Sequence, residues 1–319
     1  MFNRRFLRVK ILQTLYSYFQ SENKDGGKSL KELHLSINRT FELYLYLMNL
    51  PLALKQQGEK RLEDAAKKQI PSADDLKLNK RFITNTLIEE IDSSVKITSL
   101  SEKRGINWTS EIESVSRFYK FIRESDQYKL YMEKEENEFV EDREMLVSIF
   151  RDLLPKFDLF QHSFQEKSIY WDEEDFDYAS FLVIHTLKKT SPTKKLNDLV
   201  KDVYENKDDK AFVEKLFTKT INLDAKTEKL IMDNAKNWDA ERIAIIDMIL
   251  MKMAIAEIVN FKQIPIKVSM NEYIDIAKSF SSPKSSQFIN GIIDKVVSEL
   301  QLKKKVVKVG RGLMEGKSE

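Results

Sequence analysis

The sequence predicts an all-α protein. Only 8 glycines and 6 prolines interrupt the 319 residues, and long stretches rich in Leu, Lys, Glu, Ile and Ala lie between them. The chain has no series of short alternating apolar and polar runs bounded by turn dipeptides, the pattern typical of strands. Hydrophobic residues make up 42% and charged residues 33%, which favours a folded protein with a substantial core over a disordered one.

The composition also excludes several classes of site and location. The chain has no cysteine, which rules out disulfides, thiolate metal sites and cysteine nucleophiles and is compatible with a reducing cytoplasm. No run of about 18 apolar residues predicts a membrane span, and the N-terminus lacks the features of a signal peptide. We therefore expect a cytoplasmic protein that does not contact a membrane. Because the net charge is only +2, any affinity for nucleic acid must come from a local cluster.

The first helix is expected from about Arg4 to Gln20. Asn3 is a suitable N-cap, and the polar stretch at 23–29, with its two glycines, ends the helix. Apolar side chains recur along it at helical spacing, namely Phe2, Phe6, Val9, Leu12, Leu15, Tyr16 and Phe19.

The middle of the chain predicts a series of further helices. The longest spans about 29–68, where Pro51 is expected to introduce a kink. Acidic residues at 172–177 precede an apolar helix, as the positive end of a helix dipole favours. The remaining expected segments are a break at 70–75, amphipathic helices at 77–100, 108–135 and 137–154 closed by Pro155, and polar loops at 189–195 and 205–210.

The C-terminal third predicts a bundle with a buried central helix. The stretch from about Asp239 to Asn260 is apolar nearly all round, so it belongs at the centre of the bundle. Its interior charges must then find partners, and they are Asp247, Lys252 and Glu257. Shorter helices are expected at 212–220 and from Asp224 to about Asn237.

Two more helices are expected after an extended link around Pro265. Ser269 and Glu272 form an S-x-x-E capping box at the start of the first. Ser282 caps the second, with Pro283 at its first helical position. Residues 303–319 predict a basic, frayed tail.

Catalytic and metal sites are poorly supported. The three histidines, His34, His162 and His185, show no metal-ligand spacing. The chain has neither a Gly-rich phosphate loop nor a G-x-S-x-G motif, and the acids at 172–177 lack the glycine and spacing of a calcium loop. We interpret those acids as a solvated helix start and expect no catalytic, cofactor or metal site.

The basic first turn is the strongest candidate for a binding site. Arg4, Arg5 and Arg8 lie where the helix dipole disfavours cations, by about 0.3–1 kcal/mol each at an exposed position, and no acid precedes Glu22. Either the arginines are simply solvated, or an anion offsets this cost. Arginine suits phosphate because its planar fork donates two hydrogen bonds at once. Nearby tyrosines could belong to the core or could stack a base.

A second candidate lies at the junction between the last two helices. Residues 277–295 carry Lys278 and Lys284 among Ser, Gln and Asn side chains, which can hold phosphate or base edges at a helix N-terminus. An ordinary capped turn is the alternative. Gly291 inside a helix costs about 1 kcal/mol relative to Ala, which indicates either close helix packing or close approach by another molecule.

Both candidate stretches resemble a known family. The segments "RRFLRVKILQTLYSY" and "NWDAERIAIIDMILMKMAIAEI", followed by "IPIKVSMNEYIDIAKSF" and "SSQFINGIIDK", are similar to the bacterial antitermination factor family NusB. The resemblance covers residues 1–22 and about 211–300. The family is usually much shorter, so this chain resembles a long version with a central helical insertion.

The resemblance implies an all-helical fold of two small packed bundles and a non-catalytic role. NusB-like proteins pair with the ribosomal protein NusE, bind the boxA segment of nascent ribosomal RNA and help RNA polymerase resist termination. On this basis the chain divides into N-terminal helices at 1–68, the insertion at 69–205, a NusB-like bundle at 206–302 and the tail at 303–319.

The resemblance also implies site residues. RNA contacts fall on Arg4, Arg5, Arg8, Gln13, Tyr16, Lys278, Phe280, Gln287, Phe288 and Asn290, although Phe288 also fits the core stripe. Protein-binding residues fall on Glu241 and Asp247. Three positions depart from the family, since Met251-Lys252 replaces a common Leu-Arg and Ser281 replaces a common Gly.

Of three alternatives, the first is disfavoured and the other two remain open. A similar domain is fused to ribosomal RNA cytosine methyltransferases, but this chain lacks the cysteine nucleophile and a Gly-rich methyl-donor motif. A helical adaptor whose basic helix meets an acidic partner is a second, and a homodimer that hides the basic helix is a third. We expect replacement of Arg4, Arg5 and Arg8 by Glu to abolish RNA binding and leave helical content intact.

Overall fold

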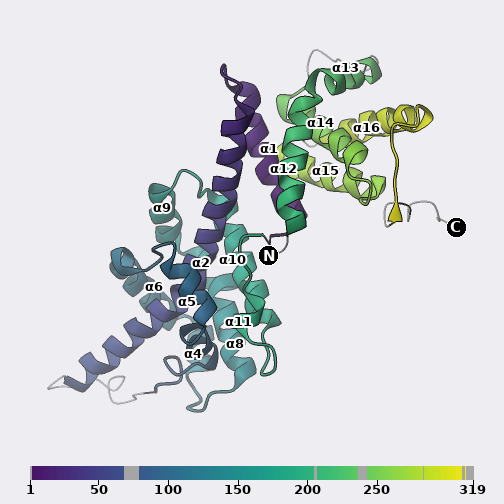
Figure 1. Ribbon diagram of the computed structural model, residues 1–319. Helices are drawn as coiled ribbons and strands as arrows, with labels where there is room; N and C mark the ends of the chain where they lie inside the picture. The colour runs from purple at the N-terminus through teal and green to yellow at the C-terminus, as the bar shows by residue number, and fades with distance from the viewer. Residues whose placement is uncertain are drawn as a thin grey trace. The chain divides into compact units, whose positions relative to one another are not determined.

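The computed structural model describes residues 2–67, 79–204, 207–235, 243–282, 284–310 and 313. Within these ranges the chain forms helices, turns and one isolated bridge between Ser191 and Lys194, and no strand. The predicted all-α class is therefore confirmed (Figure 1). None of the described helices is long and apolar enough to cross a membrane.

The chain folds into two compact units. One unit comprises residues 38–203, and the other comprises residues 2–37 together with 204–319. Helix α2 (Gly26–Lys67) belongs to both, because the division falls within it between residues 37 and 38. The predicted long helix is thus confirmed, and it continues through Pro51. The predicted break at 70–75 lies outside the described residues.

The unit of residues 38–203 is built from short helices. They are α4 (Thr86–Asp92), α5 (Val95–Glu102), the 3-10 turn η1 (Thr109–Glu111), α6 (Ile112–Glu124), α7 (Asp126–Tyr131), α8 (Phe139–Ser148), the π-helical η2 (Ile149–Leu153), the 3-10 turn η3 (Leu154–Lys156), α9 (Asp158–Lys167), α10 (Glu173–Lys189) and α11 (Leu196–Leu199).

Local caps divide the helices that the sequence predicted as continuous. The stretch 77–100 contains two helices, because the side chains of Asn85 and Ser94 each accept hydrogen bonds from the first backbone N–H groups of a new helix. Ser125 does the same between α6 and α7 within 108–135. The acidic start of α10 is confirmed, with Asp172 as its N-cap.

The other unit is a bundle around one buried helix. Helix α14 (Ile245–Asn260) packs against α1 (Arg4–Gln20), α12 (Lys207–Asn222), α13 (Asp224–Asn234), α15 (Ile266–Phe280) and α16 (Ser285–Leu302) (Figure 1). Every residue of α14 from 249 to 258 is buried. The predicted central position of this helix is confirmed, because a helix without a polar face must be covered on all sides.

Several predicted helix ends are wrong. Helix α15 begins at Ile266, so Ser269 lies inside it, fully buried, and does not cap it. Helix α12 begins at Lys207, within the predicted loop 205–210, and Asp224 is the first residue of α13 instead of its N-cap. Helix α16 begins at Ser285 after Lys284. Lys284 occupies the N-cap position of α16, so Ser282 does not cap it as predicted. The predicted cap Asp239 and Pro283, predicted as a first helical residue, lie outside the described residues.

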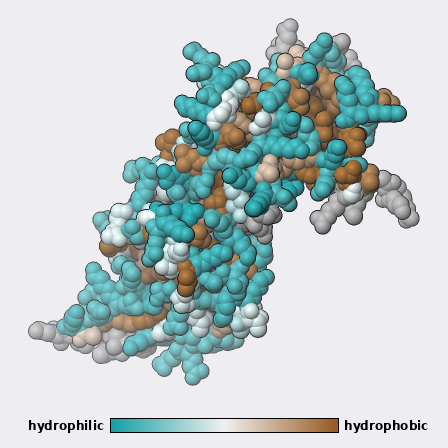
Figure 2. Space-filling view, viewed as in Figure 1, coloured by the Kyte–Doolittle hydropathy of each residue, from teal (hydrophilic) through white to brown (hydrophobic). Residues whose placement is uncertain are grey.

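The described part of the predicted frayed tail is tied to the bundle. The backbone N–H of Val309 donates to the carbonyl of Lys262 at 3.0 Å, and the ammonium of Lys308 donates to the carbonyl of Phe261 at 3.1 Å. The prediction of a frayed tail is therefore wrong for residues 303–310. Elsewhere the visible surface is mostly hydrophilic, with small hydrophobic patches (Figure 2).

Two helical glycines should respond oppositely to replacement by alanine. A Cβ at Gly58 would lie 2.6 Å from Cγ2 of Ile83, whereas a Cβ at Gly291 would meet nothing within 4 Å. Gly58→Ala should therefore destabilise the protein by about 1–3 kcal/mol through overpacking. Gly291→Ala should stabilise it by about 0.5–1 kcal/mol through helix propensity. Urea unfolding of both variants measures the difference, and shifts of the same sign would contradict the packing at Gly58.

Candidate RNA interface

The arginines of the first turn of α1 are paired with acids from other helices. Nε of Arg4 lies 3.2 Å from Oδ1 of Asp209 on α12. Arg5 donates to Glu272 and Asp275 of α15, each at 3.0 Å. The anions that offset the unfavourable helix dipole are thus supplied by tertiary structure, since α1 has no acid in its first turn.

Arg8 forms a buried, bidentate ion pair. Its Nε and Nη2 donate to the two carboxylate oxygens of Glu257 on α14, both at 2.8 Å, and the two side chains are 3% and 0% exposed. Ser269 and Tyr273 of α15 also donate to this carboxylate, at 2.7 and 2.9 Å. The buried charge of Glu257 is therefore fully compensated, as burial requires.

Burial and charge hold these groups in single protonation states. Burial by itself would lower the pKa of Arg8, but the hydrogen bonds and charge of Glu257 outweigh it and raise the pKa above its usual value. Burial, followed by the negative charge of Glu257, raises the pKa of Tyr273 well above its usual value. The phenol of Tyr273 therefore stays protonated and remains a hydrogen-bond donor.

The two basic stretches meet at shared carboxylates. Glu272 accepts from Arg5 at 3.0 Å and lies 3.4 Å from Nη1 of Arg8, so it connects the exposed arginine to the buried one. Asp275 accepts from both Arg5 and Lys278, at 3.0 and 2.8 Å. Hydrogen bonding to Lys278 and then the charge of Arg5 lower the pKa of Asp275. The structure thus brings Arg5 and Lys278 to one point on the surface.

The remaining predicted RNA residues differ in exposure. Tyr16 is 40% exposed and, by helical spacing, lies on the same side of α1 as Arg5 and the half-buried Gln13. Gln287 and Asn290 are exposed on α16 and flank Gly291 on one face. Phe280 and Phe288 are half-buried, and Ile289, the neighbour of Phe288, takes the core position.

Of the two predicted protein-binding residues, one is buried and the other lies outside the described residues. Asp247 is 5% exposed and accepts a hydrogen bond from Ser281 at 2.5 Å. Glu241 lies outside the described residues. Lys252, the third charge on α14 besides Asp247 and Glu257, pairs with Asp224 and Glu228 of α13. All three interior charges therefore have partners, as the sequence required.

The acids that organise the site were missed at the level of sequence. Asp209, Glu272 and Asp275 each bind an arginine of α1, more than 200 residues away. The sequence predicts a capping box of Ser269 and Glu272. In the structure Glu272 instead accepts from Arg8, and Ser269 donates to Glu257, the partner of Arg8. The i, i+3 spacing of Glu272 and Asp275 on one helix face was the signal available.

The histidines and acidic residues of the chain lie in ordinary structural surroundings where the structure describes them. Within the described ranges no three His, Asp or Glu side chains cluster to hold a metal ion. His34 contacts Tyr204 and Glu214, and its burial lowers its pKa. His185 stacks against Phe181.

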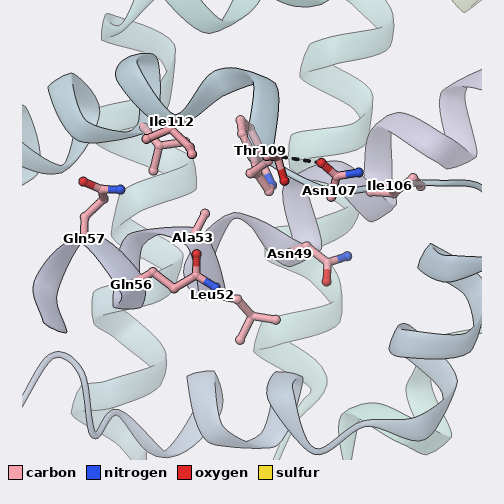
Figure 3. Close-up of a pocket in the computed structure, with 11 residues that line it drawn as sticks. Asn49, Leu52, Ala53, Gln56, Gln57, Ile106, Asn107, Thr109 and Ile112 are labelled. Carbon is pink, nitrogen blue, oxygen red and sulfur yellow. Dashed lines mark hydrogen bonds between the residues drawn. The ribbon is translucent and has the colours of Figure 1, made fainter. Parts of the chain in front are cut away.

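The unit of residues 38–203 also contains a hollow of about 260 Å³ (Figure 3). It lies beside α2 and the segment 106–112, and its lining includes the amides Asn49, Gln56, Gln57 and Asn107 around apolar side chains. None of the lining residues carries a charge or a basic nitrogen. The hollow therefore offers no general acid or general base.

The bundle defines a class of protein. It is an all-helical domain in which an arginine-rich helix is fastened by buried and half-exposed ion pairs to an apolar central helix. The sequence model of the NusB family matches residues 179–298 of this chain. The match starts within α10 and does not include α1. The rest of the chain is extra to this domain.

Curated relatives agree with this assignment. The transcription antitermination protein NusB of Salinibacter ruber is 41% identical over 103 residues, which is 32% of this chain and 64% of the relative. That of Chloroherpeton thalassium is 42% identical over 106 residues, 33% of this chain and 50% of the relative. That of Natranaerobius thermophilus is 36% identical over 89 residues, 28% of this chain and 64% of the relative. The matches therefore span less than two thirds of each relative. No solved structure is significantly similar to the chain.

The buried and the exposed arginine should differ in their effect on stability. Arg8→Ala leaves Glu257 buried without its cation, so the free energy of unfolding should fall by about 3–5 kcal/mol. Arg5→Ala removes a half-exposed pair and should cost less than about 1 kcal/mol. Thermal and urea unfolding of the full chain measure both, with wild type as the reference. Equal losses in the two variants would contradict the assigned roles.

Because Arg8 is buried, the replacement of Arg4, Arg5 and Arg8 by Glu is not a clean test of RNA binding. A glutamate at position 8 would place two carboxylates together in the core beside Glu257, so the triple replacement should disturb the packing of α1. Arg5 and Lys278, whose side chains are 49% and 60% exposed, can be reversed without this problem.

Proposed function

We propose that this protein is a transcription antitermination factor that binds boxA-type single-stranded RNA together with the ribosomal protein NusE and catalyses no reaction. The names of its curated relatives support the antitermination role. The observation that carries RNA binding is the meeting of Arg5 and Lys278 at Asp275, which joins the two basic stretches into one exposed surface. The protein would act in the cytoplasm and reach the RNA polymerase elongation complex indirectly.

An RNA phosphate would enter this surface by exchange with a carboxylate. Arg5 is half-exposed and shared between two acids, so one of its partners can be replaced by phosphate without exposing a buried charge. Arg4 is 43% exposed and offers a second site of exchange. Arg8 is buried, so its proposed part in RNA binding is to hold α1 in position for the exposed arginines.

Bases would be read beside the phosphate contacts. Exposed Tyr16 presents an aromatic ring for stacking, and the amides of Gln287 and Asn290 can pair with base edges. Phe280 and Phe288 would contribute ring edges from their half-buried positions. This mixture of cations, aromatic rings and amides favours RNA over an acidic protein partner, which would need only the cations.

The NusE surface remains a proposal based on the family. Glu241 and Asp247 are its proposed residues. Because Asp247 is buried against Ser281, we propose that it acts by fixing the junction between α15 and α16. It would then not contact NusE through its own carboxylate.

Reversing the charge of Arg5 and Lys278, the two cations that share Asp275, should weaken RNA binding. Arg5→Glu combined with Lys278→Glu should weaken binding of a fluorescent boxA-like RNA at least about tenfold, because two cations become anions. Wild type should bind more tightly with NusE, with a slope of log K against log salt of about −2 to −3 for three or four phosphates. Fluorescence anisotropy at two salt concentrations, with and without NusE, measures both quantities.

Lys229→Glu on α13 is the matched control, because it reverses one exposed cation away from α1 and α15. It should leave RNA affinity unchanged. Unchanged affinity in the double variant at Arg5 and Lys278 would exclude this surface, and the adaptor hypothesis would then be preferred.

Gly291 gives a second test that does not alter charge. No atom lies within 4 Å of a Cβ built at Gly291, which supports approach by another molecule over close helix packing as the role of this glycine. Gly291→Gln should weaken RNA binding severalfold by filling that space, and it should not lower stability, because glutamine favours a helix more than glycine does. Gly291→Ala, which adds one carbon, is the control. RNA affinity unaffected by the glutamine would place the RNA elsewhere.

A further inference from the structure

A hollow rimmed by lysines lies in the bundle, apart from the arginine cluster of α1. Its volume is about 270 Å³, and its rim carries Lys226, Lys229, Lys303 and Lys305. We propose that this lysine hollow binds an acidic peptide segment that also carries aliphatic side chains. The proposal does not depend on the proposed RNA function.

The charge of the rim favours an anionic ligand. Lys226 and Lys229 project from α13, while Lys303 and Lys305 follow the C-terminal end of α16, and all four are exposed. One carboxylate, that of Glu299, lies among them and accepts hydrogen bonds from Lys303 and from Asn234. Four cations against one anion leave the hollow positive, so it attracts a ligand with several negative charges.

The backbone places Lys305 on this rim through an unfavourable conformation. Lys304 has a φ of 54°, in the left-handed region that favours glycine. The N–H groups of Lys304 and Lys305 donate to the carbonyls of Gln301 and Leu300, both at 2.9 Å, which closes the end of α16 as such caps do. The chain then runs back across the end of α14, where Val309 donates to Lys262. The rim is therefore built from ordered backbone.

The residue types that line the floor of the hollow favour a peptide ligand over RNA. Its apolar lining is aliphatic, consisting of Leu223, Leu230, Ile255, Val259 and Leu300. None of the lining residues is aromatic or carries an amide side chain, so a base would find neither a stacking platform nor a hydrogen-bonding edge. A peptide with alternating acidic and aliphatic residues would use both the lysines and the floor. Figure 2 shows hydrophobic surface among hydrophilic side chains over α14 and α16.

The test uses the full chain and a fluorescein-labelled synthetic peptide in which Glu and Leu alternate. Wild type should bind it, and Lys226→Glu combined with Lys229→Glu should weaken binding about tenfold. A Glu–Ser peptide of equal charge should bind more weakly than the Glu–Leu peptide, because it leaves the floor uncovered. The variant Arg5→Glu with Lys278→Glu should bind the Glu–Leu peptide as wild type does.

The boxA-like RNA is the competing ligand in the same assay. The double lysine variant should retain wild-type RNA affinity, and RNA should not displace the peptide. Loss of RNA binding in the lysine variant, with no effect on the peptide, would overturn the proposal and make the hollow part of an RNA path. Equal binding of the Glu–Leu peptide by wild type and by the lysine variant would overturn it as well. The peptide measurements do not depend on whether the arginine cluster binds RNA, so failure of the RNA proposal leaves this test intact.

Discussion

The ion pair between Arg8 and Glu257 is the interaction on which the bundle depends. It is buried, bidentate and surrounded by the donors Ser269 and Tyr273, so both lone-pair directions of each carboxylate oxygen are used. It fastens α1 to α14 and α15 across 249 residues of sequence. Helix α1 lies outside the segment that matches the NusB family, and this pair joins it to the folded unit together with its buried apolar side chains.

The three arginines at the start of α1 differ in how far their side chains are exposed. Arg8 is covered, while Arg4 and Arg5 keep about half of their side chains in solvent. A phosphate cannot displace Glu257 without leaving a carboxylate buried and uncompensated, but it can displace Asp275 into water. The acids that offset the helix dipole therefore leave Arg4 and Arg5 partly exposed, as the proposed exchange with phosphate requires.

The unit of residues 38–203 also contains a buried carboxylate, that of Asp142. Asp142 is fully buried and accepts hydrogen bonds from Thr86, Tyr131 and Asn137. Burial, and then the hydrogen bond to Asp142, raise the pKa of Tyr131, which keeps the phenol protonated as a donor. Each unit thus contains a buried carboxylate that accepts hydrogen bonds from several separate segments. Such hydrogen bonds specify one arrangement of the helices, whereas apolar contacts alone would allow several.

Local signals in the sequence determined the all-helical class, the bounds of α1 and the central position of α14. Asn3 caps α1 as its side chain predicts, and the apolar surface of α14 is buried because no polar face could meet solvent. The sequence also required partners for Asp247, Lys252 and Glu257. Only the tertiary structure decided which partners they have, and it moved Ser269 from a cap to a buried donor. The reason is that capping and periodicity act within a few residues, whereas the pairing of Arg8 with Glu257 depends on how distant helices pack.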